Sequence, residues 1–331
     1  MSVALQGAIS QGILWGIMVL GVFITFRLLD IPDMTVDGSF ALGGSVVAVL
    51  IVNAHVHPAV AILAGMVAGG LAGAITGVLT TVFEIPAILA GILTQISLWS
   101  INLRIMGKSN TPLLANDTIF SDASRLTGLP QSTVSALMGI IIAIVIVAAL
   151  YWFFGTEIGS ALRATGNNED MIRALGVNTN RTKMIALVLS NALVGLAGGL
   201  ICQSQKYADI GMGTGAIVIG LAAIVIGEVL GRLLPGGLTK FGARLAAAVV
   251  GSVVYFLIRA FVLQMGMDAN DMKLLGRRAE GAGAPMDGST YGAAPRPAAA
   301  APAEAPSGAA QPFSGGGAAE TSADEVDDLP F

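Results

Sequence analysis

Eight apolar runs alternate with short polar interruptions along the chain. They cover residues 11–29, 39–54, 58–80, 86–106, 134–154, 183–203, 215–234 and 241–263. A hydrocarbon core about 30 Å thick needs roughly 20 helical residues to cross it. Most of the runs reach that length, whereas the second run is short for a full span. The pattern predicts an all-α, polytopic bundle of about eight transmembrane helices, with one short or broken helix near the N-terminus.

A polar stretch separates the first two runs. Residues 27–44 read RLLDIPDMTVDGSFALGG. Pro32 lacks an amide donor and disfavours helix at Ile31, so the helix is expected to break here. Unwound backbone at membrane depth is tolerated only where protein or water satisfies it, and transporters place substrate sites at such breaks.

Polar side chains alternate along this stretch. Asp33, Thr35, Asp37 and Ser39 would share one side of an extended backbone. We predict that Asp37 and Ser39 line or gate a transport pathway, with Asp33 as a further candidate. The alternative is a cytoplasmic turn in which Asp37 or Ser39 N-caps the second helix.

Other polar residues interrupt the later runs. Glu228 lies in VIGEVLG, and because a carboxylate at membrane depth is costly and marks a function, Glu228 is a further candidate for the substrate pathway. The alternative for Glu228 is a boundary ion pair with Arg232, four residues further along one helix. Gln95 and Asn191 are expected to form hydrogen bonds between helices.

Charge placement predicts the orientation. The longest late interruption, residues 155–183, is rich in basic residues. With this loop inside, the connecting loops place eight basic residues inside and four outside, which favours a cytoplasmic 155–183 loop and an external N-terminus. Residues 107–133 then form the main external loop.

The 155–183 loop itself predicts a short helix. Asn168 precedes it, Glu169 lies in its first turn, Arg173 follows and Gly176 ends it. These charges suit the helix dipole. A capped helix on the cytoplasmic face is suited to contact a soluble motor protein, and an ordinary connecting loop is the alternative.

The composition changes after residue 275. Residues 276–331 are rich in Ala, Pro, Gly and Ser, and hold eight acids and three arginines, a balance of −5. Since the whole chain carries −4, residues 1–275 carry +1. We therefore divide the chain into a membrane domain, 1–275, and an acidic tail, 276–331, which is expected to be disordered.

Several function classes are excluded or weakened. The chain has no G-x-x-x-x-G-K-[ST] sequence, so it is not an ATPase of that type. The chain has one cysteine, Cys202, and two histidines, His55 and His57, which lie together in one short turn. These residues offer no nucleophile–base pair and no metal cluster. No basic patch indicates nucleic acid. A secondary carrier driven by an ion gradient stays open, because it also uses broken helices.

Three stretches carry a family resemblance. They are residues 161–200 (ALRATGNNEDMIRALG onward), residues 69–94 with the Ile85-Pro86 pair, and residues 213–237 (GTGAIVIGLAAIVIGEVLGRLLPGG). Together they resemble permeases of ABC importers of the branched-chain amino acid/ribose class. The sequence DMTVDGSFALGG resembles the corresponding stretch of a less characterised branch of these permeases. For the binding proteins of that branch, aromatic amino acids, tryptophan especially, have been proposed as ligands.

The resemblance implies a permease that works by alternating access in a bacterial plasma membrane and is not itself an enzyme. Its implied partners are two ATPase subunits that bind ATP and Mg²⁺, an extracytoplasmic binding protein, a second permease copy or homologue, and lipid. The substrate is expected to be a small solute, an amino acid or a sugar. The implied ATPase contact involves Arg163, Gly166, Asn168, Glu169, Arg173 and Gly176.

One departure from that branch concerns the end of the membrane domain. Members usually continue after a segment like NDMKLL, here residues 270–275, into a last hydrophobic span. This chain instead runs into the acidic tail. Either the last span is lost or the reading frame changes near Gly276.

Overall fold

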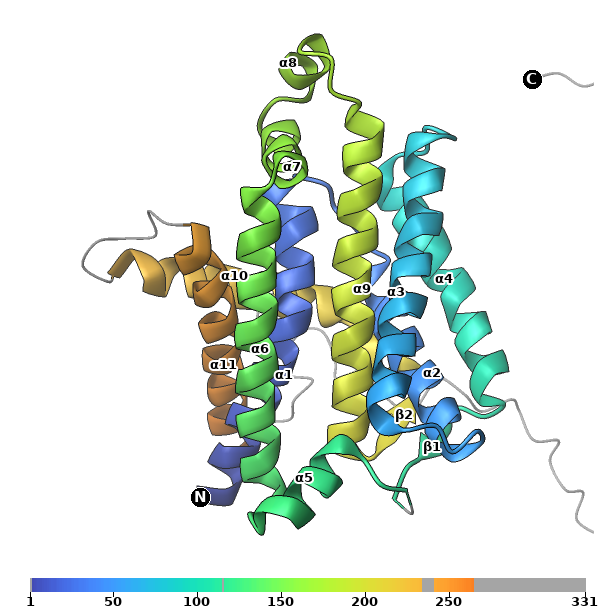
Figure 1. The fold of residues 1–331 in the computed structure, drawn as a ribbon, viewed down its shortest axis with the longest axis vertical. Helices are drawn as coiled ribbons and strands as arrows, with labels where there is room; N and C mark the ends of the chain where they lie inside the picture. The colour runs from blue at the N-terminus through green and yellow to red at the C-terminus, as the bar shows by residue number, and fades with distance from the viewer. Residues whose placement is uncertain (1, 115, 234–240, 265–331) are drawn as a thin grey trace, which may run out of the picture. The chain divides into compact units, whose positions relative to one another are not determined.

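The computed structural model describes residues 2–114, 116–233 and 241–264. The tail predicted at 276–331, and the domain boundary at 275, lie outside the described residues. In chain order the elements are α1 (Ser2–Val22), η1 (Phe23–Leu28), α2 (Val36–Val52), α3 (Pro58–Thr81), α4 (Ala87–Met106), β1 (Asn110–Pro112), α5 (Ile119–Thr127), α6 (Gln131–Gly155), α7 (Glu157–Asn167), α8 (Glu169–Ala174), α9 (Thr179–Gln205), β2 (Tyr207–Asp209), η2 (Ile210–Gly213), α10 (Ala216–Leu233) and α11 (Phe241–Gln264) (Figure 1).

Most of these helices are suited to a membrane. Seven helical stretches in the described part of the chain are long and apolar enough to cross one, and α2 is a shorter apolar helix. The predicted bundle of about eight membrane helices, one of them short, is confirmed. The reason is physical: long apolar runs without helix breakers have no other way to satisfy their backbone in lipid.

The first helix ends in an irregular segment. The α geometry of α1 changes to a π-helix, η1, which ends at Leu28. Asp30 then has a left-handed φ of 55°, and the Ile31 amide donates to the Thr25 carbonyl over 2.9 Å. Helical structure resumes only at Val36. The break predicted from Pro32 is confirmed, and we call residues 29–35 the break segment.

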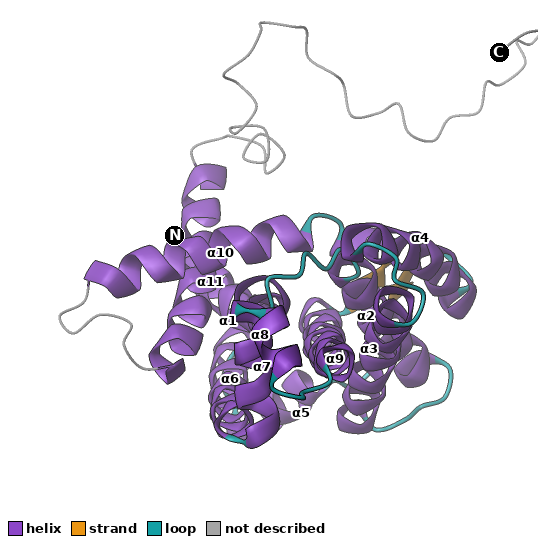
Figure 2. Ribbon diagram, turned by 90° about the horizontal axis from the view of Figure 1, so that it is seen from above, coloured by secondary structure: helices purple, strands orange, loops and turns teal. Residues whose placement is uncertain are grey.

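Helix α9 occupies the centre of the bundle. It packs against α1, α2 and α3, with α4 further out on the α3 side (Figure 2). The close approach of α3 depends on glycine: a Cβ on Gly195 would lie 2.6 Å from the Gly65 carbonyl oxygen and 3.0 Å from the Gly69 Cα. In a membrane the hydrophobic effect does not drive helices together, because lipid tails are as apolar as the side chains. Small residues at the contacts allow the close van der Waals packing that holds the helices together instead.

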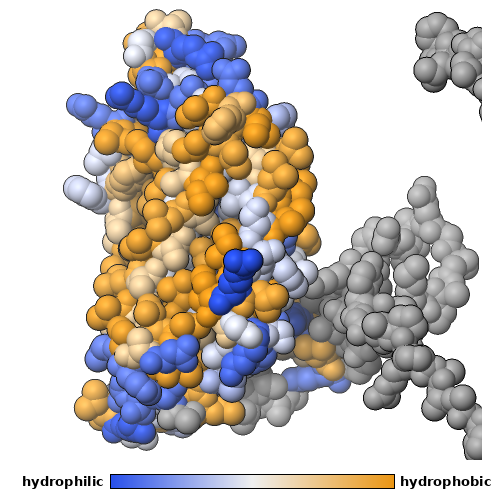
Figure 3. Space-filling view, turned by 90° about the vertical axis from the view of Figure 1, so that its right-hand side faces the viewer, coloured by the Kyte–Doolittle hydropathy of each residue, from blue (hydrophilic) through white to orange (hydrophobic). Residues whose placement is uncertain are grey.

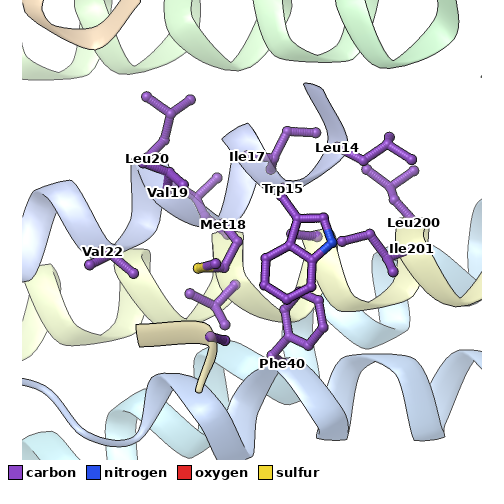
Figure 4. Close-up of a cluster of buried hydrophobic side chains, with 14 of the residues drawn as sticks. Leu14, Trp15, Ile17, Met18, Val19, Leu20, Val22, Phe40, Leu200 and Ile201 are labelled. Atoms are coloured by element: carbon purple, nitrogen blue, oxygen red, sulfur yellow. The ribbon is translucent and has the colours of Figure 1, made fainter. Parts of the chain in front are cut away.

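A cluster of large side chains fills the space between α1, α2 and α9. The rings of Trp15 and Phe40 lie 4.9 Å apart at 35°, and Leu200 and Ile201 of α9 lie beside them (Figure 4). All four side chains are buried. This cluster holds the short α2 in the interior even though α2 is too short for a full span.

The outer faces of α3, α4 and α6 are apolar and exposed. Leu71, Ile96 and Ile144 are each more than 60% exposed. Figure 3 shows an apolar band on one side of the molecule, with hydrophilic residues gathered toward both ends. A belt of this kind is what lipid tails would cover, because water would be a poor solvent for it.

The two ends of the bundle carry different short elements (Figure 1). At one end, β1 pairs antiparallel with β2, and Gln203 donates to the Pro58 carbonyl (2.9 Å) and accepts from the Ile119 amide of α5 (3.0 Å). The N-terminus lies at this α5 end. The opposite, α8 end carries α7 and α8. The N-terminus and the 155–183 loop therefore lie at opposite ends, as their predicted external and cytoplasmic placement requires.

Replacing Gly195 by alanine is expected to destabilise the bundle. The added methyl group must push α3 away from α9, and overpacking of this kind costs about 1–3 kcal/mol. The melting temperature of purified protein in detergent should fall. Gly7→Ala is the control, because a Cβ there meets nothing within 4 Å. Equal melting temperatures for the two variants would contradict the close α3–α9 packing.

Candidate functional site

The break segment is fastened to the centre of the bundle by a buried carboxylate. One Asp33 oxygen accepts the Thr35 amide (2.9 Å), and the other accepts the side-chain amide of Asn191 in the middle of α9 (2.7 Å). The Asn191 side-chain oxygen in turn accepts the Ser39 hydroxyl of α2 (2.7 Å). All these side chains are at most 1% exposed. Asp33, Asn191 and Ser39 thus join three elements through one hydrogen-bonded chain, and the predicted interhelical role of Asn191 is confirmed.

A second chain of hydroxyl groups joins the break segment to two further helices. The Thr35 and Thr76 hydroxyls lie 2.7 Å apart, and Thr76 donates to Thr94 over 3.0 Å. Thr76 belongs to α3 and Thr94 to α4. The break segment is therefore held on several sides, as non-helical backbone at membrane depth requires.

Asp37 reaches a different partner. Its two carboxylate oxygens accept the Gly215 amide (2.9 Å) and the Ile217 amide (3.0 Å), at the first turn of α10. A carboxylate satisfies orphan amides there and suits the positive end of the helix dipole. Asp37, which belongs to α2, acts as an N-terminal cap for another helix.

Two expectations for this stretch are wrong. Asp37 and Ser39 do not cap α2: Thr35 occupies the N-cap position and makes no side-chain cap bond. Nor do the four polar residues share one side of an extended strand, because helix α2 has begun at Val36. The four side chains turn instead toward α9, α3 and α10.

Next to Asp37 the interior is almost closed. A small cavity of about 20 Å³ is lined by Asp37, Gly38, Gln95 and Trp99, among others. That volume holds about one water molecule. In this conformation no solute-sized opening reaches Asp37 through that cavity, and the predicted pathway role of Asp37, Ser39, Asp33 and Glu228 stays a prediction.

Glu228 forms an ion pair, with a partner that the sequence did not indicate. The Arg27 Nε lies 2.5 Å from Glu228 Oε1, and Arg27 Nη2 lies 3.2 Å from Oε2. The alternative pairing with Arg232 is corrected by this geometry. Since Arg27 belongs to η1, the pair links α10 to the end of the first helix. The Arg27 side chain is 54% exposed, so the link is worth little energy but fixes an orientation.

The 155–183 loop contains two helices where one was expected. The predicted helix is α8: the Asn168 side chain accepts the Met171 amide (2.9 Å), and Gly176 follows the helix with φ of 86°. The additional helix, α7, buries Leu162 and exposes its opposite face. Its amphipathic spacing in the sequence is the signal that would have revealed it.

Charged residues of this loop bind within the loop. Glu169 accepts from Arg173 (2.8 Å) and pairs with Lys183 (2.7 Å). The hydrogen bond from Lys183 is the main reason that the pKa of Glu169 lies below its usual range. Arg173 also donates to the Thr179 hydroxyl (3.1 Å). These side chains fix the shape of the loop and tie α8 to the start of α9.

Two of the residues implied by resemblance contact the membrane helices. The Arg163 guanidinium lies over the ring of Phe241 in α11, 5.2 Å from its centroid. Gly166 packs against Leu28, and a Cβ at Gly166 would overlap the Leu28 carbonyl oxygen. Helix α7 therefore touches both α11 and the start of the break segment.

Two apolar side chains are exposed at α8, one within the helix and one at its C-cap, beside the exposed charged residues Asp170 and Arg173. Met171 is 52% and Leu175 is 71% exposed, one helical turn apart, whereas Ile172 between them is buried. Sequence reasoning passed over this pair in favour of the charged residues. The alternation of Ile172 with Met171 and Leu175 on a capped helix was the available signal.

These features define a class of protein. Membrane-length helices, a break held by buried hydrogen bonds, and a capped helix pair at one end together describe a polytopic transport subunit. The chain belongs to the family described as branched-chain amino acid transport system / permease component, whose model matches residues 4–276.

Curated relatives agree with this family. The chain is 38% identical to the tyrosine transport system permease protein of Clostridioides difficile (strain R20291), over 80% of this chain and 85% of the relative. It is 30% identical to the ribose import permease protein RbsC of Escherichia coli (strain K12), over 74% and 70%. It is 24% identical to the probable branched-chain amino acid transport permease protein LivH of Methanocaldococcus jannaschii, over 78% and 82%.

The chain is thus the membrane-spanning permease subunit of an ABC importer, a multi-pass protein of the inner membrane. Membership of this family implies an ATPase partner and a substrate-binding partner. The ion-driven carrier that the sequence left open is set aside, because the family is one of ABC permeases.

Replacing Asn191 by leucine is expected to weaken the bundle strongly. It removes the partner of both Asp33 and Ser39, and a buried polar group without a partner costs about 1–3 kcal/mol. The melting temperature in detergent should fall by several degrees. Asn102→Leu is the matched control, because Asn102 is equally buried but its side-chain oxygen has no hydrogen bond to any described residue. If Asn102→Leu is as damaging as Asn191→Leu, the buried chain contributes nothing specific.

Proposed function

We propose that two copies of this chain, or one copy and a homologue, enclose a transport path and work by alternating access. A binding protein delivers the solute at the α5 end, and two separate ATPase subunits bind ATP and Mg²⁺ at the α8 end. The chain itself holds no cofactor in this proposal. Its family membership and its lack of a nucleotide-binding Gly-rich sequence support this division of labour.

The proposed solute is an amino acid. The relative that is 38% identical is described as a tyrosine permease, and the relative that is 24% identical as a branched-chain amino acid permease. The ribose permease, at 30% identity, supports a sugar as the second candidate. The higher identity and the longer coverage favour the amino acid.

Helix α8 is the proposed docking element for the ATPase. Met171 and Leu175 form an exposed apolar pair that a groove on a partner can bury, as in other helix-in-groove contacts. Glu169 and Arg173 support this role by holding α8 in place, and Asn168 and Gly176 define its ends.

Movement of α8 and α7 would reach the break segment directly. Gly166 packs on Leu28, one residue before the break segment, and Arg163 packs on α11. Within the break segment and the start of α2, Asp33 holds α9 and Asp37 holds α10. A shift of α7 would therefore alter the positions of three membrane helices at once, which is the kind of rearrangement that alternating access needs.

Replacing both Met171 and Leu175 by aspartate is expected to abolish ATPase capture. Two carboxylates in an apolar groove would each have to be desolvated, so recovery of the co-expressed ATPase should fall at least tenfold. The measurement is co-purification from detergent extracts, with the melting temperature as a check on folding. Leu126→Asp is the control, because Leu126 is 88% exposed on α5 at the opposite end. Unchanged ATPase recovery by the double variant would contradict α8 docking.

A further inference from the structure

Two cavities adjoin at the α5 end. The outer cavity, of about 720 Å³, lies between the ends of α1, α6 and α11. The inner cavity, of about 550 Å³, extends to Trp15 and Phe40. Gln11, Gln205 and Arg259 line both cavities. A solute that moves between the two cavities therefore passes these three side chains.

Arg259 is an unusual residue at its position. It lies in α11, five residues before the helix ends at Gln264, with apolar residues on both sides in the sequence. Its guanidinium lies 5.7 Å from the centre of the Phe256 ring. Among the described residues, no carboxylate lies within ion-pair distance of Arg259. A cation in an apolar helix is costly, and facing a cavity it marks a binding function.

The guanidinium group selects one kind of ligand. It presents its N–H groups as a planar fork that matches a carboxylate with two parallel hydrogen bonds. Gln11 and Gln205 add amide donors at the same place. Sugar hydroxyl groups also accept hydrogen bonds from a guanidinium group, but a neutral sugar offers no negative charge to pair with it, so a carboxylate is the better match.

The inner cavity offers the other two features of an amino acid. Tyr207, which is 42% exposed, supplies an aromatic wall, and the inner end of the cavity is closed by Trp15, whose ring lies against the buried Phe40 (Figure 4). Asp209 is the inner cavity's one carboxylate among the described residues that line it. One Asp209 oxygen accepts the Gly211 amide (2.7 Å), and the other has no hydrogen bond to a described residue. A volume of this size is typical of small-molecule sites.

We propose that these residues form a binding station for a free amino acid with a large apolar side chain. Arg259 binds the carboxylate, Asp209 binds the ammonium group, and the side chain lies against Tyr207 and points toward Trp15. The inference deepens the proposed function, because it rests on an amino acid being the solute of this importer. It assigns recognition to the permease itself, at the entrance from the α5 end.

The test is ligand binding to the full-length chain, co-purified with its ATPase in phosphatidylcholine nanodiscs. Saturation-transfer NMR measures the Kd of L-phenylalanine, of phenethylamine, which lacks the carboxylate, and of 3-phenylpropionate, which lacks the amine. Arg259→Gln should weaken L-phenylalanine and 3-phenylpropionate at least tenfold and leave phenethylamine unchanged. Arg259→Lys should restore part of the loss, because it keeps the charge. Asp209→Asn should weaken L-phenylalanine and phenethylamine only.

The control is Arg125→Gln, the same substitution on α5, outside both cavities and 70% exposed. It should leave all three Kd values unchanged. The proposal is overturned if Arg259→Gln binds L-phenylalanine like the unchanged protein, or if the unchanged protein binds none of the three ligands. The proposal is also overturned if D-ribose competes with L-phenylalanine and binds Arg259→Gln with the same Kd as the unchanged protein. Failure of the ATPase to co-purify with the unchanged protein would count against the proposed function instead, so the two failures are distinguishable.

Discussion

The structure depends on satisfying a non-helical segment inside an apolar bundle. Backbone groups without partners are costly in lipid, and an isolated carboxylate is more costly still. The hydrogen bond between Asp33 and Asn191 meets this constraint, and the Thr35–Thr76–Thr94 chain extends it to α3 and α4. Because the break segment is held here, the short α2 can start within the bundle, and its Asp37 can reach the first turn of α10.

The sequence alone predicted the helices and the break, because both follow from local chemistry. Apolar runs of spanning length have one stable backbone form in lipid, and Pro32 interrupts a helix whatever surrounds it. The partners of the polar side chains were not predictable in the same way. Two contacts join residues that are far apart in the chain: Asp37 with Gly215, and Arg27 with Glu228. The spacing of residues within one segment does not predict contacts of this kind.

The 155–183 loop shows the same difference between local and long-range contacts. The cap at Asn168 and the end at Gly176 were predicted because capping is local, whereas the packing of Gly166 on Leu28 depends on how α7 folds back. The predicted contact role of Glu169 and Arg173 stays a prediction, and the structure adds contacts that charge alone did not indicate. The side chains of these two residues bind one another, Lys183 and Thr179, which leaves the apolar Met171 and Leu175 on the surface.

The central claim is that nucleotide-driven movement at the α8 end reaches the break segment through the contact between α7 and η1. Hydrogen exchange of the peptide covering residues 27–37 tests it most directly, in the assembled importer with and without a non-hydrolysable ATP analogue. The account predicts that the analogue changes exchange of this peptide, and that Gly166→Ala removes the change while the ATPase still co-purifies. Identical exchange with and without the analogue in the unchanged protein would contradict it.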